Sequence, residues 1–415
     1  MATATPGPMG WPAALDSRQA KLEPYDWYDD RRRSGPVHYD PVRECWDVFS
    51  YDLVTDVLTD PETFSSVTAP PERATGLPSM LSEDPPRHTE LRGAVDAFFT
   101  PGSVGSLVPD VERTADELLS AALEATGDES HTDEATDAGS RSSEITDGTR
   151  MELVDELARP LPIHTIAALL GVPADDRAQF ERWSDAVIAG PALTGGDSER
   201  LERQRGEAAN ALASYFAEIS RERRENPGED LVSRVLAETD LTDLELLGLF
   251  RLLLVAGNVT TTNLITNALW ALTETDSLTR LRDDPSLVDG VVEETLRYRS
   301  PVQRTIRRAT RDVDLRGHEV AADDRVVVWL GAANRDPAAF DEPDRFRLDR
   351  THNPHVGFGR GIHVCLGAAL ARIEGRIAIE RLLERTETIE PIETTFEPVS
   401  STFIYGLQRF PVSIR

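Results

Sequence analysis

The residue with the clearest chemical potential in this sequence is Cys365. It follows a glycine-rich loop, HVGFGRGIH at residues 355–363, and directly precedes a run with helical apolar periodicity. A cysteine at a helix N-terminus faces peptide N–H groups and the positive end of the helix dipole, which stabilise a thiolate that can bind metal. The glycines let a flat ligand approach the backbone closely. The residue types therefore indicate a metal-binding thiolate beside a flat ligand.

An isolated cysteine is more often a small buried hydrophobe, and this is the role we assign to Cys45 beside Trp46. Around Cys365, in contrast, the pattern F-x-x-G-x-H-x-C-x-G is complete. Five fixed positions, each with roughly 5% usage, occur by chance in about one chain in ten thousand of this length. The pattern is carried by Phe358, Gly361, His363, Cys365 and Gly367.

This pattern resembles the haem-binding loop of the cytochrome P-450 superfamily, the haem-thiolate enzymes. The resemblance implies that Cys365, and not His363, is the proximal ligand of haem b (iron protoporphyrin IX). It also implies that the other residues of this loop surround the haem. A thiolate donates electron density to the iron and promotes O–O cleavage on the opposite face. In soluble bacterial-type members, matching positions hold the haem propionates. In this sequence they are occupied by His355, His88, Arg92 and Arg307.

A long apolar segment at residues 246–272 contains one charged residue, Arg251. Asparagines and threonines interrupt the apolar run, so we expect a helix that crosses the protein interior rather than a membrane. Gly257 in its middle costs about 1 kcal/mol relative to alanine, and its β-branched neighbours add to that cost. We therefore predict a local deformation of this helix.

The AGNVTT run of this segment begins at Ala256 and is similar to the A-G-x-acid-T-T motif of the superfamily's distal helix. The resemblance implies that Ala256 and Gly257 form a groove for dioxygen. It also implies that Thr260, followed by Thr261, supplies a hydroxyl for oxygen binding and proton delivery. Val259 departs from the motif, because a valine cannot relay protons. Another group or water substitutes for the acid, or the oxidant is not made from O2 in the usual way, as in a peroxide-using or nitric-oxide-reducing enzyme.

A further match concerns the charges expected to brace the cysteine loop. Glu294 and Arg297 are spaced i,i+3, which alone is weak, since exposed pairs of this kind contribute under about 1 kcal/mol. They match the superfamily's E-x-x-R, and the resemblance implies that Arg350 completes a buried cluster with them. The resemblance extends from about Trp27 to Ile414.

The elements that must position these residues are mostly helices. We predict a mainly α chain with a small β part, the cytochrome P-450 fold, in which an irregular arm (1–20) precedes one haem domain (21–415) with an acidic surface insertion (127–150). A small hairpin is expected within residues 36–49. Helical periodicity predicts helices at 151–170, 173–188, 198–223, 243–274 and from about 365, and alternation predicts strands at 302–309, 313–315 and 325–329.

The composition restricts the partners. The 415 residues carry 44 basic and 73 acidic side chains, a net charge of −29, which disfavours nucleic acid. Only Lys21 is a lysine, and the spread of acidic charge is typical of a halophile's cytoplasmic protein, in which salt screens self-repulsion. Two distant cysteines fit a reducing cytosol. We expect a cytoplasmic protein without a membrane anchor.

The function implied is a monooxygenase that inserts one atom of O2 into a small apolar organic substrate. Electrons would come from a separate ferredoxin or flavodoxin with its reductase, because no flavin or iron–sulfur motif is present. A haem-binding sensor without turnover and a haem-free helical scaffold are the alternatives from other classes. Substrate identity is not readable, although Arg304 could anchor a carboxylate or face solvent or the haem. Segments that match substrate-facing regions are 68–81, 187–193, 253–259, 302–306 and 403–405.

Overall fold

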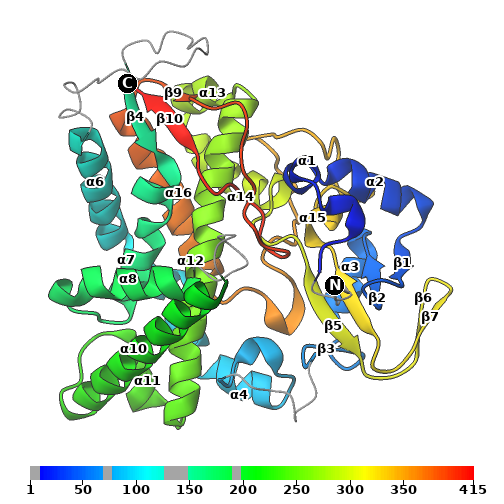
Figure 1. The fold of residues 1–415 in the computed structure, drawn as a ribbon, viewed down its shortest axis with the longest axis horizontal. Helices are drawn as coiled ribbons and strands as arrows, with labels where there is room; N and C mark the ends of the chain where they lie inside the picture. The colour runs from blue at the N-terminus through cyan, green and yellow to red at the C-terminus, as the bar shows by residue number, and fades with distance from the viewer. Residues whose placement is uncertain (1–9, 69–76, 126–147, 189–197) are drawn as a thin grey trace.

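The computed structural model describes residues 10–68, 77–125, 148–188 and 198–415. Helices occupy one side of the molecule and a small sheet with short helices occupies the other (Figure 1). A long helix, α12 (Asp243–Glu274), runs through the helical side, and its bounds coincide with those predicted from the sequence. The mainly α architecture with a small β part is confirmed.

Helix α12 owes its start to a capping box and its path to its composition. The Oγ1 of Thr242 accepts from the N–H of Glu245 (3.4 Å), and the Glu245 carboxylate accepts from the N–H of Thr242 (2.9 Å). By length and composition α12 could cross a membrane, alone among the described helices. Every residue from Thr261 to Leu272 is nevertheless buried within the protein, as expected for a core helix.

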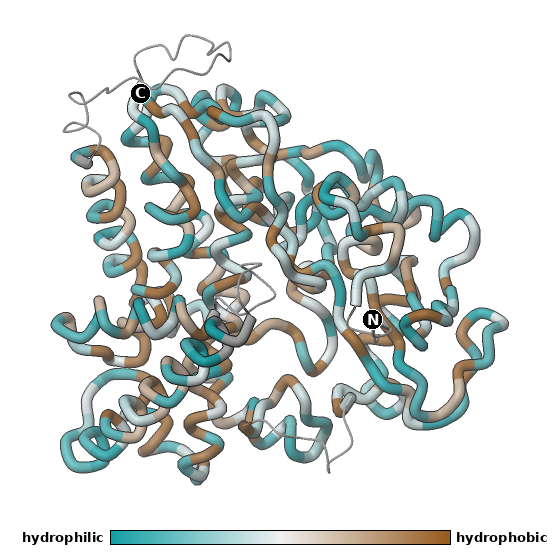
Figure 2. The backbone as a smooth tube through the Cα atoms, in the orientation of Figure 1, coloured by the Kyte–Doolittle hydropathy of each residue, from teal (hydrophilic) through white to brown (hydrophobic). Residues whose placement is uncertain are grey.

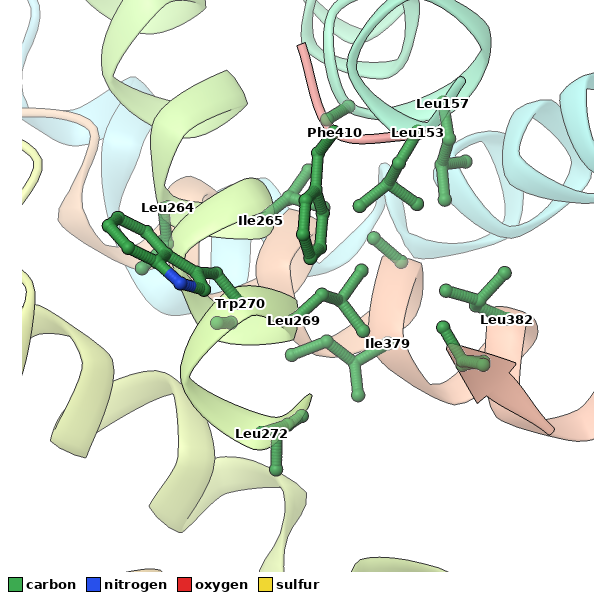
Figure 3. Close-up of a cluster of buried hydrophobic side chains, with 14 of the residues drawn as sticks. Leu153, Leu157, Leu264, Ile265, Leu269, Trp270, Leu272, Ile379, Leu382 and Phe410 are labelled. Carbon is green, nitrogen blue, oxygen red and sulfur yellow. The ribbon is translucent and has the colours of Figure 1, made fainter. Parts of the chain in front are cut away.

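The other long helices surround α12 and supply the core. Figure 3 shows Leu269 of α12 beside Ile379 of α16, with Phe410 from the C-terminal segment packed next to them. Figure 2 shows brown, apolar stretches along the helices that meet there. The helices of this side are α6 (Val108–Ala125), α7 (Pro160–Leu169), α8 (Arg177–Ile188), α10 (Ser198–Glu225), α11 (Leu231–Glu238), α13 (Ser277–Asp283), α14 (Val288–Tyr298) and α16 (Ala368–Arg385).

The larger sheet lies on the opposite side and has the strand order β1-β2-β8-β5-β3. The predicted hairpin is confirmed as the antiparallel pair β1 and β2, in which Val37 lies opposite Val48. The sheet then joins distant segments, since β2 runs parallel to β8 with Trp46 opposite Val326. Its strands are β1 (Val37–Asp40), β2 (Cys45–Val48), β3 (Phe64–Ser65), β5 (Thr305–Ala309) and β8 (Arg325–Val328).

A second, three-stranded sheet corrects one prediction. Residues 151–152 were expected to begin a helix, but β4 (Thr149–Glu152) pairs with β10 (Pro411–Ile414), which also pairs with β9 (Ile389–Pro391). Met151 is opposite Val412, a partner too distant along the chain for local periodicity to indicate. A single π-helical turn follows before α7 begins. The strand β6 (Val313–Leu315) matches the prediction, whereas its hairpin partner β7 (His318–Val320) was not predicted. Most of the insertion at 127–150 lies outside the described residues.

The N-terminal arm is more regular than predicted where it is described. A short 3-10 turn, Ala13–Leu15, precedes α1 (Arg18–Leu22), and Leu15 is 1% exposed in a core cluster with Tyr28 and Trp329. Leu15 therefore anchors this part of the arm to the sheet side of the fold, while most of its neighbours are exposed. The remaining helices are α2 (Tyr25–Ser34), α3 (Tyr51–Thr59), α4 (Arg87–Gly93), α5 (Pro101–Gly105) and α15 (Leu330–Ala333).

Candidate active site

Cys365 lies at the end of a tight loop that leads into α16. Its N–H donates to the carbonyl of Phe358 (2.9 Å), which closes the loop. Gly359 and Gly361 have φ values of +72° and +71°, in the left-handed region that favours glycine. A Cβ on Gly361 would also collide with the carbonyl oxygen of Leu58. The loop glycines are thus required by backbone geometry in this chain.

The Cys365 side chain is accessible to solvent, and its neighbour Val364 is 40% exposed. Burial of the thiol among the surrounding protein nevertheless raises its pKa, against a backbone hydrogen bond from Gly367 and the positive charge of Arg92. An additional positive charge at the sulfur, such as that of a metal ion, would stabilise the thiolate.

The middle of α12 presents an accessible stripe on an otherwise buried helix. Ala256 is exposed, and Val259 and Thr260 are partly exposed, while Asn258 and Thr261 on another face are buried. Thr260 Oγ1 donates to the carbonyl of Ala256 (2.7 Å). A side-chain bond to a helix carbonyl of this kind competes with backbone bonding and favours local bending. Thr260 and the predicted groove residue Ala256 therefore lie on the accessible face of α12.

Cationic and donor side chains gather at the other end of the cysteine loop. The rings of His88, on α4, and His363 lie 4.2 Å apart between centroids. Burial lowers the pKa of His363 to about 4, and the charges of Arg307, His88 and Arg92 act in the same direction. Arg92 also donates to the carbonyl of Val364 (2.7 Å). The fold thus brings together four predicted cofactor-binding residues from separate segments: His88, Arg92, Arg307 and His363.

Only part of this cluster has a countercharge among the described residues, since Arg92 pairs with Asp96 at 2.5 Å. Burial lowers the pKa of Arg307, which is 7% exposed, and Asp84 is the carboxylate that opposes this. Among the described residues, His88 Nδ1 and His363 Nε2 are buried without a hydrogen-bond partner. Buried polar atoms and charges normally have partners. The residues therefore fit a haem, whose anionic propionates would accept from these donors while Cys365 faces the iron.

His355 is not part of this cluster. Its Nε2 lies 3.0 Å from Oε2 of Glu293 on α14, and its Nδ1 accepts from the N–H of Gly357 (3.2 Å). Against the effect of burial, hydrogen bonds from His355 and Arg372 lower the pKa of Glu293 to about 2. The structure therefore gives His355 a bracing contact to α14, and its predicted role towards a haem propionate stays a prediction.

The predicted Glu-Arg-Arg cluster is present and buried. Glu294 and Arg297 are each 0% exposed and form a two-point ion pair, with distances of 2.7 and 2.9 Å. Arg350 Nε lies 3.0 Å from Glu294 Oε2. Arg297 also donates to the carbonyls of Asn334, Pro343 and Arg345. The cluster therefore ties α14 to the segment that leads into the cysteine loop.

Arg304 lies away from this site. It is 0% exposed and donates to the carbonyls of Thr402 (2.6 Å) and Gly10 (3.0 Å). Its guanidinium also lies 5.1 Å from the ring centroids of Trp329 and Phe403. Arg304 therefore holds the N-terminal arm, and the suggestion that it faces solvent is wrong.

The expected substrate-facing segments are only partly described. Residues 69–76 and 189–197 lie outside the described part of the chain. Of the others, Tyr405 is 4% exposed, and its hydroxyl donates to the carbonyl of Leu22 (2.7 Å). Tyr405 therefore belongs to the core, whereas Phe403 and Ile404 are partly exposed.

One functional candidate was missed by the sequence reasoning. Glu374 of α16 is 2% exposed and hydrogen-bonds with Thr165 of α7 and Thr261 of α12. Burial raises its pKa to about 8. The sequence contains a signal for this residue, because Glu374 falls between Leu370 and Ile377 in the apolar stripe of its helix, where a carboxylate is costly.

Comparison with known proteins extends over nearly the whole chain. The family model described as Cytochrome P-450 matches residues 180–410. The chain is 40% identical to Cytochrome P-450 109 of Bacillus spizizenii, covering 96% of this chain and 94% of the relative. It is 39% identical to the cytochrome P-450 monooxygenase PikC of Streptomyces venezuelae, covering 95% and 91%, respectively.

Solved structures of cytochrome P-450 proteins are also similar to this chain over nearly its whole length. Substrate-free CYP109E1 from Bacillus megaterium matches with a TM-score of 0.85 and 38% identity, covering 95% of this chain and 99% of that one. Its complex with testosterone matches with a TM-score of 0.82 and 38% identity, covering 96% and 99%.

Proposed function

The chain belongs to the cytochrome P-450 family and is a haem-thiolate monooxygenase that binds haem b, and from this premise we propose a role for each residue of the site. When bound, the haem supplies the activation of dioxygen that no amino-acid side chain provides. Relatives are described as monooxygenases and hydroxylases, which leaves the peroxide-using, nitric-oxide-reducing and sensor alternatives without support.

Cys365 is the proximal ligand in this proposal, and the observation that carries it is the exposed position of this residue at the end of the glycine loop. Cys45, the other cysteine, is 1% exposed, and burial raises its pKa to about 12, so it remains an inert thiol. Phe358, Gly361 and Gly367 shape the loop around the sulfur. Arg372, whose guanidinium lies 4.7 Å from the Phe358 ring centroid, fixes that ring.

His88, Arg92, Arg307 and His363 bind the propionates. The support is their convergence and the unpartnered buried nitrogens of the two histidines. His355 contributes indirectly, because its contact with Glu293 positions the loop.

On the distal side, Thr260 holds a proton at its Oγ1 for delivery towards the haem, and Ala256 and Gly257 leave room beside it. A Cβ at Gly257 would meet only the flexible side chain of Ile166, at 3.2 Å. Thr261 faces away from this stripe and acts through its buried contacts. Val259 contributes no proton, so the distal side needs another donor.

The enzyme needs a redox partner and takes an organic substrate. We propose a ferredoxin or flavodoxin with its reductase as the donor, one haem domain spanning residues 21–415, and a cytoplasmic location in a salt-accumulating cell. The last point depends on the net charge of −29 and on the single lysine among 44 basic residues. Small apolar molecules of steroid size are the first substrates to test, because CYP109E1 was solved with corticosterone and with testosterone.

The test is the carbon monoxide difference spectrum of the reduced, haem-loaded protein in molar salt. Thiolate ligation by Cys365 predicts a strongly red-shifted Soret band that Cys365→Ser abolishes. The matched control is Cys45→Ser, which should leave the band unchanged. Survival of the band in Cys365→Ser, with the haem still bound, contradicts the assignment.

A further inference from the structure

Two segments that were expected to face the substrate are joined to each other through their backbones. Val302 and Ile404 form an antiparallel bridge. The N–H of Gln303 donates to the carbonyl of Phe403 (2.8 Å). The side chains of Val302 and Ile404 remain partly exposed, so they are available for contact with another molecule. These four residues form one unit, which we call the paired wall.

The chain that continues the paired wall contacts the turn of α12 that carries Thr260. A Cβ on Gly406, two residues after Ile404, would lie 1.8 Å from Oδ1 of Asn263, so the backbone at Gly406 touches this side chain. Asn263 in turn donates from Nδ2 to the carbonyl of Val259 (2.7 Å), the residue before Thr260. The wall is therefore anchored to α12 within one helical turn of Thr260.

Arg304 connects the paired wall to the N-terminal arm. It follows Gln303 directly in the chain. Its Nε donates to the carbonyl of Thr402 (2.6 Å), the residue before Phe403, and its Nη2 donates to the carbonyl of Gly10 (3.0 Å). The two bonds leave from different nitrogens of one planar guanidinium. The position of this group therefore fixes the wall and the arm relative to each other.

Aromatic rings hold the guanidinium of Arg304 in its place. Its Cζ lies 5.1 Å from the ring centroids of Trp329 and Phe403, and 6.0 Å from that of Trp11. These distances are in the range of cation–π attraction. Trp329 is fully buried in the core of the sheet side, Phe403 belongs to the paired wall, and Trp11 belongs to the arm. Each of the three parts therefore contacts the same guanidinium.

The burial of this charge is costly and is offset by contacts that position the backbone. Arg304 is 0% exposed, and burial lowers its pKa to about 10, with the charge of Arg43 acting in the same direction. Asp47 is the carboxylate that opposes this shift most strongly. A charge in such a place needs good partners. The hydrogen bonds of Arg304 to two backbone carbonyls fix the course of two chain segments.

We propose that Arg304 is a positioning residue for the substrate, because it sets how closely the paired wall approaches a molecule bound beside Thr260. Arg304 does not touch this molecule and acts through Val302 and Ile404. A wall that is already fixed needs no ordering when an apolar group packs against it, so the group binds more tightly. The inference rests on the proposed function, in which the haem and Thr260 define the place of oxidation.

The test compares two azoles that bind haem iron, imidazole and 4-phenylimidazole, with the haem-loaded protein in molar salt. Each azole shifts the haem spectrum when its nitrogen binds the iron, but only the phenyl ring extends towards the paired wall. Arg304→Lys keeps the positive charge, but its single ammonium does not span the two carbonyls. This variant should weaken binding of 4-phenylimidazole about fivefold and change that of imidazole by less than about twofold.

The matched control is Arg282→Lys. Arg282 also donates to two backbone carbonyls, those of Leu383 (2.9 Å) and Thr386 (2.6 Å), and burial lowers its pKa as well. It joins α13 to the end of α16, so both azoles should bind the variant as they bind the parent protein. If Arg304→Lys weakens both azoles equally, or does not weaken 4-phenylimidazole, the proposal is overturned.

A second background separates positioning from a general structural effect. Ile404→Ala removes a side chain of the wall, so adding Arg304→Lys should then change 4-phenylimidazole binding by less than about twofold. An equal effect of Arg304→Lys in both backgrounds would mean that Arg304 acts elsewhere, and would reject the proposal.

Trp11→Ala provides the test if Arg304→Lys does not fold. It removes one aromatic contact of Arg304 at a partly exposed position, and should lower the affinity for 4-phenylimidazole relative to imidazole by about twofold. An unchanged ratio of the two affinities would contradict the proposal.

Failure of the proposed function gives a different result. If imidazole does not shift the haem spectrum of the parent protein, the haem site itself is wrongly assigned. A normal imidazole shift, with the same ratio of azole affinities in the parent protein and in Arg304→Lys, rejects only the positioning role of Arg304.

Discussion

The cysteine loop before α16 and the middle of α12 differ in how their polar side chains are partnered. The cysteine loop before α16 is braced by short ion pairs, including the Glu294 cluster and the Glu293 contact with His355. The middle of α12 instead has an accessible stripe on one side and unpartnered polar atoms of Asn258 on the other. The loop is therefore organised to hold one geometry, and the helix is organised to admit water and small molecules.

Because of this difference, we expect the ion pairs near the cysteine loop to affect folding stability, and the polar groups beside α12 to affect the response to pH. The buried carboxylate of Glu294 neutralises the arginines beside it. Removing one partner therefore leaves an uncompensated charge inside the core. Beside α12, burial raises the pKa of Glu374 to about 8, which favours the neutral acid at neutral pH, so the main cost is expected when this group ionises. Variants near the cysteine loop should therefore lose stability through the loss of an ion pair, whereas variants at Glu374 should change how stability depends on pH.

The largest effect is expected at the proximal brace. Glu294→Gln leaves Arg297 and Arg350 buried without a countercharge, which should lower the free energy of unfolding by about 3–5 kcal/mol and loosen the haem. Urea unfolding and haem retention in molar salt measure both effects. Glu342→Gln, on an exposed pair with Arg345, is the control and should leave the free energy of unfolding nearly unchanged, because solvent screens this pair. Equal costs for the two variants would contradict the comparison.

An intermediate effect is expected from pH at Glu374. Its folded-state pKa of about 8 lies above the ordinary value of 4.5, so the folded state binds this proton more tightly than the unfolded state does. The contribution is complete below pH 4.5 and is lost as the pH rises towards 8. Between pH 5 and pH 9 the loss should be about 3–4 kcal/mol.

The measurement is the unfolding free energy of the parent protein and of Glu374→Gln at each pH. Because the variant lacks this titration, the difference between the two proteins should change steadily in favour of the variant as the pH rises. A difference that stays flat from pH 5 to pH 9 would show that Glu374 is already ionised in the folded protein.

The smallest effect is expected at the α12 groove. Gly257→Ala gains up to about 1 kcal/mol of helix propensity, while its Cβ displaces only the flexible end of Ile166, so stability should change by about 1 kcal/mol or less. Gly248→Ala, in the same helix, collides with the backbone carbonyl of Pro78 and should be clearly destabilising. Thermal unfolding distinguishes them, and a larger loss at Gly257 than at Gly248 would mean that the groove is packed more tightly than the structure shows.

Local sequence patterns were sufficient for the elements whose partners lie nearby. The bounds of α12 and the hairpin of β1 and β2 follow from periodicity, whereas the buried Glu294 pair with Arg297 was predicted from the resemblance. Prediction failed where a distant segment decided the outcome. Met151 was expected in a helix but forms a strand, because Val412 lies opposite it. Arg304 is held by the N-terminal arm, which no local pattern indicates.

The sequence by itself determined the family of this protein, because the cysteine loop and the AGNVTT turn are contiguous runs that carry the resemblance, and that resemblance predicts a thiolate ligand and a distal hydroxyl. The tertiary structure decided which groups carry charge and which partners they have. Burial raises the pKa of Cys365 despite its place before a helix, His355 pairs with Glu293, and Glu374 meets Thr165 and Thr261 from two other helices. Desolvation and hydrogen bonding depend on packed neighbours that are remote along the chain, so only the fold sets the protonation state of these side chains.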